Sequence, residues 1–258
     1  QNLTIANNGT ATFKDDGIVI KGKKIKYFKD KSLLIISSGN ISSIDKNFEI
    51  NSEIIEYKIN ESNLNFEKNI VINDGINNLV INSREINYNL DERKIVSQDY
   101  SEIFDDLNNT YKVDGFEYSI EDKIIKLNNL VAQDKDKNSF LVDLSFLDLN
   151  KKELIAKDII INFKLNENSE NEPRLKGRSL VSDERNTIVK KGTFTFCKKR
   201  DKCPPWEMSA EEIRHDKQKK IIHYKNASLK LYDKKVFYFP KFFHPDPTVK
   251  RQSGFLIP

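Results

Sequence analysis

The sequence contains two nearly identical stretches, INSEIIEY at residues 50–57 and INSREINY at residues 81–88. Each ends in a tyrosine, and two more tyrosines extend the series with spacings of 30, 31 and 30 positions. The four are Tyr27, Tyr57, Tyr88 and Tyr118. Recurrence at a fixed period of this size is typical of repeat architectures. We therefore expect the chain to be built from similar consecutive units.

The residues before each tyrosine follow a common pattern. Seven positions earlier stands an apolar or aromatic residue: Ile20, Ile50, Ile81 and Tyr111. Two positions earlier stands another: Ile25, Ile55, Ile86 and Phe116. Five positions earlier stands a small residue in three copies, with Val113 as the exception: Gly22, Ser52 and Ser83. A late copy has Met208, Ala210, Ile213 and His215 in the four places, and a weaker candidate has Ile155, Lys157, Ile160 and Asn162.

The units are predicted to be β-strands. Apolar and polar residues alternate with period two around 48–52, which is the pattern of a half-buried strand. The small residue lies five positions before the tyrosine and the second apolar residue lies two positions before it, so strict alternation would put them on opposite faces. This change of parity predicts a bulge inside each unit. Asparagine tolerates the left-handed backbone conformation, so a recurring Asn followed by an apolar or small residue predicts a fixed bulge or turn. It occurs at Asn40, Asn69, Asn129 and Asn226, and the third copy lacks it.

Segment 209–220 is charged enough to suggest a helix, but the repeat register predicts strands there. Many short antiparallel strands at regular spacing favour an all-β sandwich, jelly roll or stacked β architecture.

Composition excludes several classes of protein. The length of 258 residues suggests one or two domains. With 43 basic and 39 acidic residues the net charge is only +4, which argues against wrapping nucleic acid. No apolar run approaches the ~18 residues of a membrane-spanning helix. The absence of a signal peptide at Gln1 fits either a processed or a cytosolic protein.

The last third of the chain has a different character, because six of the seven prolines follow residue 200 and both cysteines lie there. An ordered set of motifs marks it: TFTFC (193–197), CPPW (203–206), IRHD (213–216), NA (226–227), VFYFP (236–240), FHPD (243–246) and KRQSGFL (250–256). This set resembles the LPS-assembly proteins LptD, also called organic solvent tolerance proteins, at the junction between their periplasmic domain and their barrel.

The resemblance implies a fold and a place in the cell. It implies an open antiparallel β-jelly roll of the OstA/LptA type over 1–235, built from the ~30-residue repeats. A polar, repeat-poor stretch lies at about 164–185, where the sequence leaves a loop and a strand equally open. Residues 236–258 would lead into an outer-membrane β-barrel. The domain would stand at the periplasmic face of the cell outer membrane.

The resemblance also implies partners. Lipopolysaccharide would arrive from an LptA-like bridge protein that adds to an edge strand, and an LptE-like lipoprotein would occupy the barrel. The expected function is transport without catalysis, with no cofactor, no metal and no nucleic acid.

The repeated apolar positions are the candidate lipid-binding groove. Each buried CH₂ of an acyl chain is worth roughly 0.8 kcal/mol, so a lipid carrier needs a continuous apolar lining. The predicted lining is Ile25, Ile50, Ile55, Ile81, Ile86, Phe116, Met208 and Ile213. The alternative is a packed core in a structural or adhesive β-repeat protein that binds only proteins. An open trough would favour the carrier, and a closed sandwich would favour the alternative.

The cysteines and histidines leave further alternatives. Cys197 and Cys203 are close enough in sequence for a local disulfide, while the resemblance implies pairing with barrel cysteines. A zinc site needs more ligands than these two. None of the three histidines stands in a His-Glu-x-x-His motif, and His215 occupies a repeat position, so it is predicted to be structural. No catalytic residue is predicted.

Overall fold

The computed structural model describes residues 2–45, 47–134, 136–165, 172–198 and 205–249. The residues divide into two compact units, Gln1–Leu130 and Val131–Pro258. Within the described ranges the regular structure is 18 strands and two 3₁₀ helices, which confirms the predicted all-β class. No described helix is long and apolar enough to cross a membrane.

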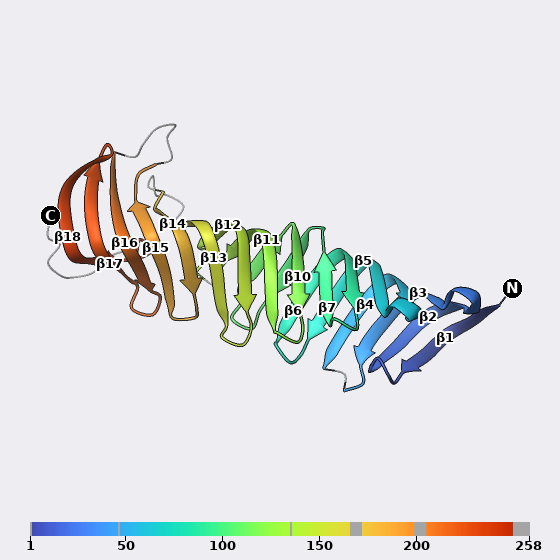
Figure 1. The fold of residues 1–258 in the computed structure, drawn as a ribbon. Coiled ribbons are helices and arrows are strands. Elements are labelled where there is room, and N and C mark those ends of the chain that lie inside the picture. The colour runs from blue at the N-terminus through green and yellow to red at the C-terminus, as the bar shows by residue number, and fades with distance from the viewer. Residues whose placement is uncertain (1, 46, 135, 166–171, 199–204, 250–258) are drawn as a thin grey trace. The chain divides into compact units, whose positions relative to one another are not determined.

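The first unit contains eleven strands, the last of which runs three residues past its end. They are β1 (Leu3–Phe13), β2 (Ile18–Phe28), β3 (Leu33–Ser43), β4 (Phe48–Lys58), β5 (Asn63–Asp74), β6 (Leu79–Asn89), β7 (Lys94–Ser97), β8 (Ser101–Phe104), β9 (Thr110–Val113), β10 (Gly115–Ser119) and β11 (Ile124–Gln133). Helices η1 (Lys29–Lys31) and η2 (Ile59–Glu61) are single turns between strands. From β1 to β6 each strand pairs antiparallel with the next, and the strands lie side by side in Figure 1.

Beyond β6 the strands are shorter because each is divided in the middle. β6 pairs with β7 at one end and with β8 at the other. β7 then pairs with β10, and β8 pairs with β9. This division lies where the third repeat copy lacks its asparagine, so a break replaces the bulge.

The second unit is a meander of seven antiparallel strands. They are β12 (Ser139–Asp148), β13 (Glu153–Asn162), β14 (Arg174–Ser182), β15 (Asn186–Thr195), β16 (Trp206–Asp216), β17 (Ile221–Leu231) and β18 (Lys234–Pro245). Each strand pairs with its neighbour in sequence. The charged segment 209–220 lies mostly in β16, as the repeat register predicts, and β14 provides an ordered strand within the polar stretch 164–185.

The bulges lie inside the strands, as the change of parity predicts. In β4 the buried side is occupied by Ile50 and Ser52 and then by Ile55 and Tyr57, with a register shift between Asn51 and Ile54. Asn69, Asn129 and Asn226 have φ of 50°, 50° and 52°, so the left-handed asparagines are confirmed. Asn40 is the exception: it is extended, and Ser38 takes the left-handed conformation in β3 with φ of 48°.

The predicted division into 1–235 and 236–258 stays a prediction. The contacts divide the chain at another place, and residues 236–245 belong to β18, which pairs with β17 along its length. Residues 250–258 lie outside the described part of the chain.

Candidate functional site

All eight predicted lining residues are buried inside their units. The exposed fraction of each is zero or a few per cent, and the largest value is 6%, at Ile25 and Met208. The full set is Ile25, Ile50, Ile55, Ile81, Ile86, Phe116, Met208 and Ile213. The repeat therefore marks one inward-facing side of the sheet.

In the first unit the inward side chains form continuous lines across the strands. One line, on β2 to β6, consists of Ile25, Ile36, Ile55, Phe66 and Ile86. A second line consists of Ile20, Ile41, Ile50, Ile72 and Ile81. Directly opposite residues on paired strands lie within about 5 Å of one another, so each line is a row of touching side chains.

The second unit has the same construction around its two predicted residues. Met208 on β16 stands between Phe194 on β15 and Leu229 on β17. Ile213 stands between Val189 and Tyr224 on the same two strands. The inner side of this unit is therefore also apolar from strand to strand.

Two of the five residues in each line lie outside the repeat copies. Ile36, Phe66 and Ile72 lie on β3 and β5, the return strands between the repeat copies. Their signal is ordinary alternation, visible in NLNF at 63–66, and it carries no tyrosine marker.

The interior of the first unit is filled by the protein's own side chains. Ile50, Ile55 and Ile81 have no exposed area, and neither do their cross-strand partners Ile72 and Phe66. An acyl chain that entered either line would have to displace these side chains. Access therefore requires the sheet to open or a side chain to change rotamer.

The small residues of the repeat are explained by packing at the bend. A Cβ at Gly22 would lie 2.3 Å from Cγ2 of Ile36, and one at Gly39 would lie 2.6 Å from the same atom. In β4 the corresponding residue is Ser52, whose hydroxyl donates to the carbonyl oxygens of Ile54 and Glu67 at 2.9 and 2.8 Å. The sheet folds sharply here and leaves no room for a larger side chain.

The tyrosine at the end of the repeat contacts an aspartate in two copies. The Tyr57 hydroxyl donates to Asp16 at 2.5 Å, and the Tyr118 hydroxyl donates to buried Asp74. Burial, with the adjacent aspartate, raises the pKa of both tyrosines above the usual range.

His215 takes the tyrosine's place in the late copy. Its Nε2 lies 2.5 Å from Oδ2 of Asp246, just after β18. Burial raises the pKa of Asp246, but hydrogen bonds from His215 and Thr248 outweigh it and hold the pKa below its usual value. A structural role for His215 fits these contacts.

Each unit presents an edge strand. β1 pairs with β2, and β18 pairs with β17, and within the described ranges the register pairs neither strand with a further one. Both edges carry exposed apolar side chains, including Ile5 on β1 and Phe237 and Phe243 on β18. An unpaired edge of this kind can accept a strand from another chain.

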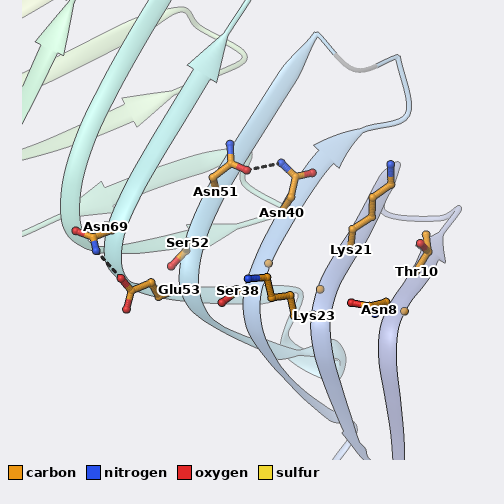
Figure 2. Close-up of a pocket in the computed structure, with 13 residues that line it drawn as sticks. Asn8, Thr10, Lys21, Lys23, Ser38, Asn40, Asn51, Ser52, Glu53 and Asn69 are labelled. Carbon is orange, nitrogen blue, oxygen red and sulfur yellow. Dashed lines mark hydrogen bonds between the residues drawn. The ribbon is translucent and has the colours of Figure 1, made fainter.

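The outer side of the first unit has a polar hollow of about 550 Å³, shown in Figure 2. Its floor is the backbone at Gly9, Gly22, Gly39 and Ser52, which are cross-strand neighbours. Polar side chains stand on both sides of this floor: Asn8, Thr10, Lys21, Lys23, Ser38, Asn40, Asn51, Glu53 and Asn69. Asn40 donates to Asn51 at 2.9 Å, and Asn69 donates to Glu53 at 2.5 Å.

The predicted cysteine pair stays a prediction, because Cys203 lies outside the described residues. Cys197 is half-buried just after β15, and its carbonyl oxygen accepts a bond of 2.5 Å from Nη1 of Arg174.

Part of the chain is similar to known proteins. The LPS-assembly proteins LptD of Yersinia pestis bv. Antiqua (strains Antiqua and Nepal516) and of Yersinia pseudotuberculosis serotype I are each 39% identical to it over 79 residues. The matched segment is 31% of this chain and 10% of each relative, so the chain spans about a tenth of their length. No family model matches the chain.

Proposed function

We propose that this chain is the periplasmic part of an LPS-assembly translocon and passes lipopolysaccharide toward an outer-membrane barrel. The observation that carries the proposal is the strand-to-strand line of inward apolar side chains, in a chain that shares a segment with LptD. Lipopolysaccharide would enter between the two halves of the bent sheet with its acyl chains inward.

The energetics favour such a lining. A twelve-carbon chain would cost on the order of 10 kcal/mol to expose to water at about 0.8 kcal/mol for each CH₂. Moving packed isoleucines apart costs much less if they then pack against the acyl chain, because their apolar area stays buried. Successive lines of isoleucine and phenylalanine would therefore let a chain advance in small steps.

The edges suit the partners. An LptA-like bridge protein would add a strand to β1, where main-chain groups are free on one side. An LptE-like lipoprotein would act through the barrel that the relatives' family carries. The role needs binding and release only, so we propose no enzymatic step.

Photo-crosslinking in cells tests the proposal. A benzoyl-phenylalanine at Ile55 or Ile86 in the complete protein should capture lipopolysaccharide on irradiation. Arg84 and Glu85 are matched controls, because both are exposed on β6, the strand that carries Ile86, and neither lines the polar hollow. Retained protease resistance of each variant shows that the bulky probe has not unfolded the domain.

A second candidate is a structural or adhesive β-repeat protein that binds only proteins. The observation that favours it is the filled interior, with no exposed area at Ile50, Ile55 and Ile81. Folded Ile55 and Ile86 variants that capture only protein, or capture lipopolysaccharide no better than the Arg84 and Glu85 controls, would support this candidate and refute transport.

A further inference from the structure

A second hollow, in the second unit, repeats the construction of the one in Figure 2. It measures about 390 Å³ and is lined by Asp158, Ile159, Ile160, Lys176, Gly177, Arg178, Lys191 and Thr193. Both hollows lie where the strands bend, and both have a glycine backbone as floor. They belong to separate units.

One strand of each hollow carries a glycine between two cations. In β2 the sequence is Lys21-Gly22-Lys23, and in β14 it is Lys176-Gly177-Arg178. A Cβ on Gly22 or Gly177 would point into the packed interior, 2.3 Å from Ile36 or 2.1 Å from Val189. Successive residues of a strand face opposite sides, so both flanking cations project outward over the glycine.

The neighbouring strand also matches. Thr10 is opposite Lys21, and Thr193 is opposite Lys176. In each strand the threonine is preceded by a glycine, and that glycine by a residue with positive φ: Asn8 (49°) and Lys191 (50°). The same six-position arrangement therefore occurs in both units.

The charge of both hollows favours an anion. Cations outnumber carboxylates by two to one in the first hollow and by three to one in the second. Glu53, the carboxylate of the first hollow, already accepts a hydrogen bond from Asn69. The interactions among the described residues give Lys21, Lys23, Lys176, Arg178 and Lys191 no carboxylate within ion-pair distance.

We propose that each hollow binds a phosphate monoester carried on a hydroxyl-rich ligand such as a phosphorylated sugar. Two cations flanking a bare glycine backbone can hold one phosphate from both sides, with a threonine hydroxyl as a further donor. In the first hollow Ser38, Asn40 and Asn51 add hydroxyl and amide groups that suit sugar hydroxyls. The proposal concerns the outer face and is independent of the apolar interior.

The test is an NMR titration of the whole chain with glucose 6-phosphate. The amides of Gly22 and Gly177 should shift with saturation, while unphosphorylated glucose should leave them in place. In the double variant Lys21→Gln/Lys23→Gln, affinity at the first hollow should fall at least tenfold while Gly177 still responds. Because the contact is electrostatic, raising the salt concentration should weaken binding.

A charge-matched control distinguishes binding at the hollow from non-specific attraction of the anion to a positively charged surface. Lys24→Gln/Lys26→Gln removes the same two charges from the same strand, and neither residue lines the hollow. It should change the affinity by less than twofold. An equal loss in both double variants, or equal shifts with glucose, would overturn the proposal.

Two further ligands identify the source of the phosphate. Inorganic phosphate that binds as well as glucose 6-phosphate would show that a free anion suffices. Micellar lipopolysaccharide that shifts the same amides, when neither soluble compound does, would show that the headgroup of a lipid is the source. Both results support the phosphate site, and failure of all three ligands refutes it.

Discussion

At the scale of single residues, the close packing of the sheet depends on glycines, which have no side chain. Gly22 and Gly39 both face Ile36, and the space that each would need is already taken by its Cγ2. The repeat pattern identified Gly22, Ser52 and Ser83 as small, but it did not show what lies beside them. The contacts show that packing fills the space beside the glycines, because atoms of Ile36 and Ile55 lie where the added Cβ atoms would be.

Replacing Gly22 with alanine should therefore destabilise the first unit by about 1–3 kcal/mol, the usual cost of overpacking. Ile36→Ala alone should cost about 2–5 kcal/mol through the cavity it leaves. In the double variant the new methyl occupies part of that cavity, so the combined loss should be clearly smaller than the sum. Urea unfolding of the four proteins measures this coupling, and simple additivity would show that the two positions do not compete for space.

At the scale of elements, the prediction from sequence was good wherever a pattern stays within one strand. Period-two alternation and the change of parity in 50–57 were enough to predict strands and their bulges. Asn69, Asn129 and Asn226 adopt the predicted backbone because asparagine tolerates positive φ. Asn40 fails because the bulge in β3 lies two residues earlier, at Ser38, where a serine takes the same conformation.

Features that depend on pairing between strands could not be predicted. Lys21-Gly22-Lys23 reads in sequence as an ordinary solvated charge run. Only the register that sets Thr10 and Asn40 beside Lys21 shows that it borders a hollow. The division of the strands after β6 could not be predicted either. The absence of the asparagine from the third copy showed only that this copy differs from the others.

Three strands of the first unit are joined by one carboxylate. Glu117 on β10 contacts Lys126 on β11 at 2.7 Å and Lys94 on β7 at 2.8 Å. Hydrogen bonds from Lys126 and then Lys94 lower the pKa of Glu117 from 4.5 to about 2. The folded-state pKa is the lower one, so the stabilisation is complete above pH 4.5 and disappears as the pH falls toward 2.

Glu117→Gln should lower the free energy of unfolding at pH 7 by less than about 1 kcal/mol, because the group is partly exposed and solvent screens it. The difference from the unmodified protein should shrink steadily between pH 4.5 and pH 2. Glu121→Gln, in the exposed turn after β10, is the control and should show no such trend. A difference at Glu117 that stays constant with pH would mean that the ion pairs do not stabilise the unit.

At the scale of the whole molecule, β1 is an edge strand that can pair with another chain. β1 is exposed along most of its length, with Leu3 at 39% and Ile5 at 51%. Such an edge favours strand addition unless charge prevents it. The concentrated protein is therefore expected to self-associate through β1.

Leu3→Lys/Ile5→Lys should suppress this self-association without lowering the melting temperature, because both side chains are already exposed. Sedimentation velocity over a range of concentrations measures the effect. Ile44→Lys/Ile76→Lys makes the same chemical change at exposed residues between strands and should leave association unchanged. If both double variants behave alike, association depends on general surface hydrophobicity and β1 has no special part in it.

A residue with positive φ recurs in β1, β3 and β5 of the first unit, at Asn8, Ser38 and Asn69, and this repetition makes the design extensible. Inserting a copied hairpin of about 30 residues would add two strands and roughly 10 Å of sheet at 4.7–4.9 Å a strand. The cross-section would be preserved, since every new side chain would meet the neighbours its template already meets. Duplication of a short piece of the gene would therefore lengthen the sheet of such a domain without changing how its strands pack.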